Sequence, residues 1–148
     1  MTDALLRTDW TDMLARGAAP GSEALRAHLR VVHQTHAGFT ERCAARCRDA
    51  AGRTSYEWLV ETVEPDRHRA LLDLACGSGP LLGLCHARLP ADMRLVGVDM
   101  SPEELALARA RLPEGRADLL EARADRLDVL ADGSVDVALC HWALTLMD

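Results

Sequence analysis

The chain has 148 residues, a formal net charge of −6 and 49% hydrophobic residues, which suits one globular domain and excludes a large multidomain assembly. An acidic balance without an arginine-dense stretch argues against a nucleic-acid groove, which needs a basic patch. No apolar run approaches the roughly 18 residues of a membrane span, and the first residues lack the basic and apolar regions of a signal peptide. We therefore expect a soluble, cytoplasmic protein without a nucleic-acid or membrane partner.

The first 65 residues contain four predicted helices separated by Gly and Pro residues. These helices cover residues 3–16, 22–36, 40–50 and 55–63. Cys43 and Cys47 lie one helical turn apart, and His33 and His36 share a helix face. A solvated helix surface is the ordinary explanation for both pairs, because no further ligand at metal-binding spacing joins them. The cysteine number is odd and no C-x-x-C pair occurs, so we expect reduced thiols and no metal site.

From residue 66 onward, short apolar runs alternate with helical stretches. Strands are predicted over residues 70–76, 94–99, 118–123 and 134–142, and helices over residues 81–89 and 101–112. This alternation predicts βαβ units and a parallel sheet. Ser101 is a good N-cap, Pro102 suits the first helical position, and Glu104 suits the carboxylate of a capping box. That helix start places Asp99 at the carboxyl end of the preceding strand.

Residues 72–80 (LDLACGSGP) carry the most informative motif. Gly77 and Gly79 after a buried strand allow a tight turn and a close backbone approach, and the following helix would direct its free amides at an anionic group. Asp99 lies 20 residues beyond Gly79, where a carboxylate can accept both hydroxyl hydrogens of a ribose. The combination predicts a nucleoside-binding site. The alternative is a structural turn with an unrelated exposed acid.

The NAD fingerprint G-x-G-x-x-G requires a third glycine where this chain has Leu82, so an NAD(P)-binding fragment is the weaker interpretation. The sequence resembles class I S-adenosylmethionine-dependent methyltransferases, most of all the bacterial small-molecule type. Three segments carry the resemblance: 71–84 (LLDLACGSGPLLGL), 95–112 (LVGVDMSPEELALARARL) and 132–148 (DGSVDVALCHWALTLMD). It implies a Rossmann-like α/β domain over residues 66–148 with strand order 3-2-1-4, and a helical lid over residues 1–65.

The resemblance also implies S-adenosylmethionine as the methyl donor, S-adenosylhomocysteine as the product, and a small-molecule acceptor in a biosynthetic pathway. Asp73 would stand near the methionine end of the cofactor, Asp99 would hold the ribose hydroxyls, and Met100 would lie beside the adenine. Asp125 matches the acid that faces the adenine amino group, but its spacing to the next motif is one residue short, so Asp128 or a backbone amide is the alternative. The full implied set is Asp73, Ala75, Cys76, Gly77, Gly79, Asp99, Met100, Asp125, Arg126, Cys140 and Tyr56.

On the acceptor side, the resemblance places Phe39, His141 and Trp142 near the substrate. His141 is the one residue there that can take a proton at neutral pH, which makes it the candidate general base. A packing role is the alternative, because methyl transfer can depend on orientation more than on a base. Helix packing explains Phe39 and Tyr56 equally well, since aromatic residues are rare in this chain (3%) and cores use them first.

The sheet of the family has seven strands in the order 3-2-1-4-5-7-6, and this sequence supplies the first four. The fourth strand is then an apolar, uncharged edge of the kind that pairs with another chain or aggregates. We expect a second polypeptide that carries the remaining strands, which would make this chain one subunit of a split, heterodimeric methyltransferase. Self-association and artificial truncation are the alternatives. The chain is either the catalytic subunit or a non-catalytic, stabilising one, and the retained Gly77, Gly79 and Asp99 favour catalysis.

Overall fold

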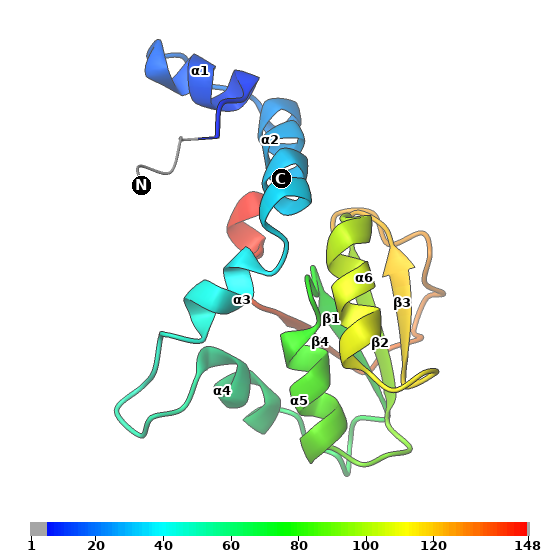
Figure 1. The fold of residues 1–148 in the computed structure, drawn as a ribbon. Helices are drawn as coiled ribbons and strands as arrows, with labels where there is room; N and C mark the ends of the chain where they lie inside the picture. The colour runs from blue at the N-terminus through cyan, green and yellow to red at the C-terminus, as the bar shows by residue number, and fades with distance from the viewer. Residues whose placement is uncertain (1–5, 148) are drawn as a thin grey trace.

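The computed structural model describes residues 6–147 of the chain. Its strands form one parallel sheet in the order β3-β2-β1-β4 (Figure 1). These strands are β1 (Ala70–Leu74), β2 (Arg94–Asp99), β3 (Ala117–Glu121) and β4 (Val137–Cys140). The predicted Rossmann-like α/β fold and its strand order are therefore confirmed. No helix within residues 6–147 is long and apolar enough to cross a membrane.

Four helices precede the sheet and two connect its strands. The first four are α1 (Asp9–Ala15), α2 (Ser22–His36), α3 (Phe39–Ala44) and α4 (Ser55–Glu61). The crossover helices are α5 (Pro80–Arg88) and α6 (Pro102–Arg111), and a 3₁₀ helix, η1 (Leu144–Leu146), follows β4. Helices α5 and α6 lie on the same face of the sheet, whereas α1 and α2 extend beyond it (Figure 1).

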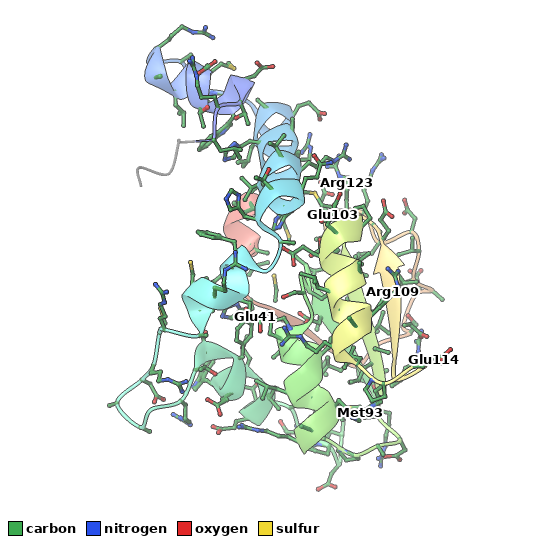
Figure 2. The ribbon with its side chains drawn as sticks, viewed as in Figure 1. Glu41, Met93, Glu103, Arg109, Glu114 and Arg123 are labelled. Atoms are coloured by element: carbon green, nitrogen blue, oxygen red, sulfur yellow. The ribbon has the colours of Figure 1, made fainter. Side chains whose placement is uncertain are left out.

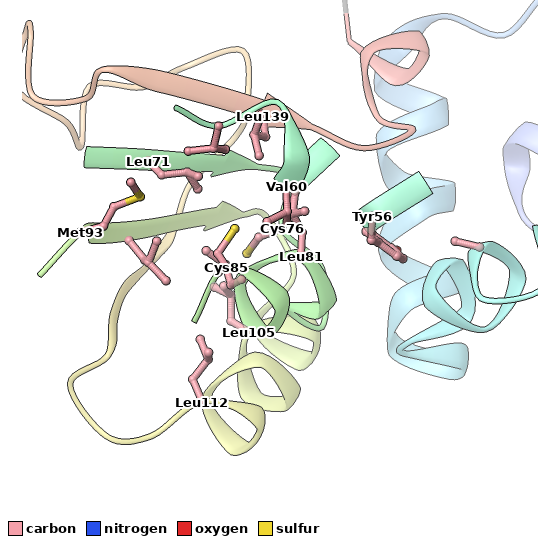
Figure 3. Close-up of a cluster of buried hydrophobic side chains, with 14 residues drawn as sticks. Tyr56, Val60, Leu71, Cys76, Leu81, Cys85, Met93, Leu105, Leu112 and Leu139 are labelled. Atoms are coloured by element: carbon pink, nitrogen blue, oxygen red, sulfur yellow. The ribbon is translucent and has the colours of Figure 1, made fainter. Parts of the chain in front are cut away.

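The two faces of the sheet are covered differently, because successive strand residues point to opposite sides. Leu71 and Leu95 belong to a large apolar cluster with buried residues of α4, α5 and α6, part of which Figure 3 shows. Leu72 and Val96 point to the other face, against partly buried residues such as Leu127 from the segment between β3 and β4. Burial on both faces explains why these strands read as continuous apolar runs.

Most element bounds agree with the sequence prediction to within two residues, and three segments differ. The helix predicted over 40–50 ends at Ala44, because the Asp49 carboxylate accepts the backbone N–H groups of Ala51 and Arg53 at 2.9 Å and favours a turn. The strand predicted over 134–142 begins only at Val137, since the Asp136 carboxylate accepts the N–H groups at the start of β1. The helix predicted over 3–16 begins only at Asp9, because Thr8 caps it by accepting the Thr11 N–H; the predicted start at residue 3 lies outside the described residues.

Strand β4 forms one edge of the described sheet, where it pairs with β1. Apolar side chains follow it along the chain: Trp142 and Leu146 are exposed, and Leu144 is 67% exposed. The segment then runs to η1, whose Leu146 lines the same cavity as Leu29 of α2. The fold thus brings the end of the described chain next to the N-terminal helices (Figure 1).

Candidate functional site

The turn after β1 is held by the carboxylate of Asp99 at the end of β2. Asp99 Oδ2 accepts the Gly77 N–H at 2.8 Å, and Oδ1 accepts the Ser101 N–H at 2.9 Å. Gly77 and Ala75 both have positive φ angles, 51° and 58°, so the chain reverses sharply there. Ala75 holds a conformation that costs an L-residue roughly 1–2 kcal/mol. The result is a fixed, open turn at the carboxyl ends of the two central strands.

The two glycines of the motif have different surroundings. Gly77 lines a cavity above the strand ends. Gly79 does not line it: a Cβ atom at Gly79 would lie 3.0 Å from the Cβ of Ala108 on α6. Gly79 therefore permits the close packing of α5 on α6, and the prediction that it lines the cofactor stays a prediction.

The cavity brings together most of the predicted site residues. It lies between the carboxyl ends of β1, β2 and β4 and residues of the N-terminal helices α2 to α4. The predicted residues that line it are Asp73, Ala75, Cys76, Gly77, Asp99, Met100, Asp125, Tyr56, His141 and Trp142. Arg126, Cys140, Asp128 and Phe39 lie outside this lining, and Phe39 is 49% exposed on α3.

Buried carboxylates give the cavity an acidic floor. Asp73 on β1 is buried, and burial followed by the nearby charge of Asp99 raises its pKa well above the usual value. Burial also raises the pKa of Asp99, against the opposing effect of the N–H groups of Ser101 and Gly77. Such a floor favours ligands that present positive charge or hydroxyl donors.

Asp125 has a partner within the chain. Arg123 binds both oxygens of its carboxylate, with Nε donating to Oδ1 at 2.8 Å. This ion pair lowers the pKa of Asp125. Both residues line the cavity, and Arg123 holds the Asp125 carboxylate in place.

His141 follows β4 and forms an aromatic wall. Its ring lies 4.0 Å from that of Tyr56 and 4.8 Å from that of Trp142, measured between centroids. Its Nε2 lies 2.7 Å from Ser55 Oγ at the start of α4. Burial lowers the pKa of His141, which keeps the ring neutral at pH 7. Its Nδ1 is buried and has no hydrogen-bond partner among residues 6–147.

Glu104 and His33 belong to the site, and the sequence reasoning placed neither there. Ser101 caps α6 by accepting the Glu104 N–H at 3.2 Å, but the Glu104 carboxylate turns away from the predicted capping box. Its Oε1 accepts hydrogen bonds from His33 Nδ1 at 2.9 Å and from the Gly38 N–H at 2.8 Å. His33 is thus mostly buried against α6, which corrects its assignment to a solvated surface. The missed signal was a charged residue beside Leu105, on the buried face of a helix.

A second acid also connects the N-terminal helices to the turn. Glu41 of α3 accepts hydrogen bonds from Ser78 Oγ at 2.8 Å and from Arg111 Nη2 at 2.6 Å. Figure 2 shows Glu41 between α3 and the crossover helices. Helices α2, α3 and α4 are therefore each joined to the strand-end region by polar contacts that border the cavity.

Comparison with known proteins identifies the family. A family model described as a methyltransferase domain matches residues 71–148, which is more than half of the chain. The chain therefore belongs to this family, and its resemblance to class I S-adenosylmethionine-dependent methyltransferases is confirmed.

Individual relatives cover only parts of the molecule. A trans-aconitate 2-methyltransferase from Methylobacterium radiotolerans is 41% identical over 68 residues, which span 46% of this chain and 25% of the relative. One from Escherichia coli O1:K1 / APEC is 39% identical over 56 residues, or 38% of this chain and 22% of the relative. The chain thus matches about a quarter of the length of these curated relatives.

A solved structure supports the fold. The S-adenosylmethionine-dependent methyltransferase from Thiobacillus denitrificans, in complex with S-adenosyl-L-homocysteine, has a TM-score of 0.53 and 19% identity. The comparison covers 80% of this chain and 44% of that one. At this identity the likeness concerns the Rossmann-like architecture.

The buried pair of His33 and Glu104 predicts a pH-dependent stability. The hydrogen bond to Glu104 raises the pKa of His33 against the effect of burial, so its contribution is complete below about pH 6.5 and is lost as pH rises through the raised value. For Glu104, burial acts to raise the pKa, but the bonds from His33 and Gly38 outweigh it and lower the pKa. Its contribution is lost only as pH falls from about 4.3 through the lowered value.

We therefore expect the wild type to exceed His33→Gln in free energy of unfolding at pH 5.5, with the difference shrinking as pH rises above 6.5. Urea denaturation from pH 5 to pH 9 measures it. His36→Gln is the matched control, because His36 is exposed on the same helix. A difference that stays constant with pH would contradict the assignment.

Proposed function

We propose that this chain binds S-adenosylmethionine and forms the cofactor-binding part of a methyltransferase that acts on a small molecule. The observation that carries the proposal is the pairing of the Gly77 turn with the Asp99 carboxylate above a buried acidic floor. Family membership supports the same reaction class. The proposed acceptor class draws on the two relatives, both of which are named for methylation of trans-aconitate.

The residues present fit this ligand. Gly77 leaves open space around its Cα, because the nearest atom to a Cβ built there would be Glu104 Oε2, at 3.9 Å. Asp99 offers lone pairs to ribose hydroxyls beyond the two backbone bonds it already accepts. Asp73 adds a buried carboxyl group near the positively charged end of the donor, whose charge would counteract the raised pKa of Asp73. When bound, the donor would supply a methyl group on a sulfonium centre, so that an acceptor atom bonds to the methyl carbon while the methyl–sulfur bond breaks and the thioether S-adenosylhomocysteine leaves.

The chain would act mainly by orientation and by exclusion of water. Tyr56 and Trp142 give the cavity apolar surfaces on both sides of His141, which suits transfer in a dry site. Where the acceptor atom is a protonated hydroxyl or amine, we propose that the neutral His141 ring takes its proton at Nδ1, the buried nitrogen without a partner among the described residues. Ser55 would act as a positioning residue for the ring, because its Oγ lies 2.7 Å from Nε2.

Calorimetric titration with S-adenosylhomocysteine tests the binding proposal. We expect Asp99→Asn to weaken binding at least tenfold, since a hydrogen bond to a charged group contributes about 1.5–3 kcal/mol. Asp92→Asn removes an exposed carboxylate in a loop and should bind as the wild type does. Circular dichroism would verify that both variants are folded. Absence of binding by the folded wild type would refute the proposed function.

A separate measurement tests the role of His141. His141→Ala should lower the rate of methyl transfer by about 10²-fold or more, within the range of general base catalysis, with a much smaller change in cofactor affinity. Single-turnover kinetics in the assembled enzyme separates the two effects. An unchanged rate would assign His141 to packing, and cofactor binding without any transfer in the assembled enzyme would favour a non-catalytic, cofactor-binding subunit.

We further propose that additional strands cover the free edge of β4, and that a second polypeptide supplies them. In support, β1 is the strand that pairs with β4 among the described residues, and exposed apolar side chains follow β4. Alone, the chain should self-associate through this surface. Leu144→Lys should reduce the association seen by light scattering, whereas Leu107→Lys, exposed on α6, should not. A wild type that stays monomeric at high concentration would contradict the proposal.

A further inference from the structure

Glu104 has a carboxylate whose two oxygens are in different situations. The residue is 2% exposed at the first turn of α6. Its Oε1 accepts both hydrogen bonds from the N-terminal helices, from His33 and from the Gly38 N–H. Its Oε2 is buried without a hydrogen-bond partner among residues 6–147. The bonds at Oε1 lower the pKa of Glu104 despite its burial, so the group is ionised at neutral pH.

A buried carboxylate oxygen without a partner is costly, because it has lost its hydration and gained no donor in exchange. Packing alone does not explain it, since the neighbouring buried positions of α6 are the apolar Leu105 and Ala108. Glu104 lines the cavity, and its buried Oε2 is the nearest atom to a Cβ built on Gly77, at 3.9 Å. The Gly77 N–H in turn donates to Asp99. Two carboxylates therefore flank the same turn.

We propose that Glu104 Oε2 accepts a hydrogen bond from one ribose hydroxyl of the nucleoside ligand, beside Asp99, and thereby couples ligand binding to the docking of α2 and α3. The inference rests on the proposed function, because it takes the ligand to be S-adenosylmethionine or its product. We take the hydrogen-bond donor to be a hydroxyl, because Asp99 would hold the ribose at this turn and Glu104 lies beside the same turn.

The coupling follows from the use of one carboxylate for two tasks. Oε1 holds the junction of α2 and α3 through His33 and Gly38, while Oε2 faces the ligand. A ligand hydroxyl that donates a hydrogen bond to Oε2 removes the free-energy cost of the unpartnered oxygen. It can do so only while the Glu104 side chain stays bonded to His33 and Gly38. Ligand binding therefore favours the docked helices, and by linkage the docked helices favour the ligand by the same factor.

The test is calorimetric titration with S-adenosylhomocysteine and with its 2′-deoxy and 3′-deoxy forms. Glu104→Gln keeps an acceptor oxygen toward His33 and Gly38 and places an NH₂ group at the Oε2 position, where it opposes a ligand donor. We expect this variant to bind S-adenosylhomocysteine about tenfold more weakly, and to bind one of the deoxy forms as well as the wild type does. Glu103→Gln is the matched control, because Glu103 lies in the same turn of α6 (Figure 2).

Hydrogen exchange at the Gly38 amide gives a second readout that does not depend on turnover. S-adenosylhomocysteine should slow this exchange in the wild type, and the deoxy form that lacks the contacting hydroxyl should not. The inference would be overturned if each deoxy form lost as much affinity, relative to S-adenosylhomocysteine, in Glu104→Gln as in the wild type. It would also be overturned if S-adenosylhomocysteine left the exchange rate of the Gly38 amide in the wild type unchanged. A wild type that fails to bind S-adenosylhomocysteine would refute the proposed function instead.

Discussion

The carboxylate of Asp99 is the interaction on which the site depends. Its two oxygens accept N–H groups from Gly77 and Ser101, so one side chain at the end of β2 fixes the turn after β1 and the start of α6. A charged acceptor with two backbone donors is a strong arrangement, because charge-assisted hydrogen bonds are about twice as strong as neutral ones. The same geometry leaves the carboxylate at the cavity wall, where its remaining lone pairs can meet a ligand.

The N-terminal helices are docked by polar contacts around that turn. Glu41 binds Ser78 of the turn itself, Glu104 holds His33, and Ser55 contacts His141. Each of these contacts borders the cavity, so the cover of the site and the site itself share side chains. Helix α4 also contributes buried residues to the main apolar cluster, which fixes one part of the cover more firmly than polar contacts alone would.

Local signals predicted the centre of the fold well. Strand β2 has the predicted bounds, one residue beyond the uncharged run at each end, and α6 begins where Ser101 and Pro102 place it, because caps and continuous apolar runs act over a few residues. The start of β4 and the end of α3 were not predictable in this way. They depend on the side chains of Asp136 and Asp49, which compete with regular structure for backbone N–H groups.

The sequence by itself determined the parallel sheet, the turn with Gly77 and the placement of Asp99, since these follow from spacing along neighbouring elements. Only the tertiary structure decided which residues meet across the cavity. It assigned Gly79 to helix packing and paired Glu104 with His33, 71 positions apart in the chain. The physical reason is that the sequence pattern shows which face of a helix is buried, whereas the partner of a buried charge depends on how separate elements pack.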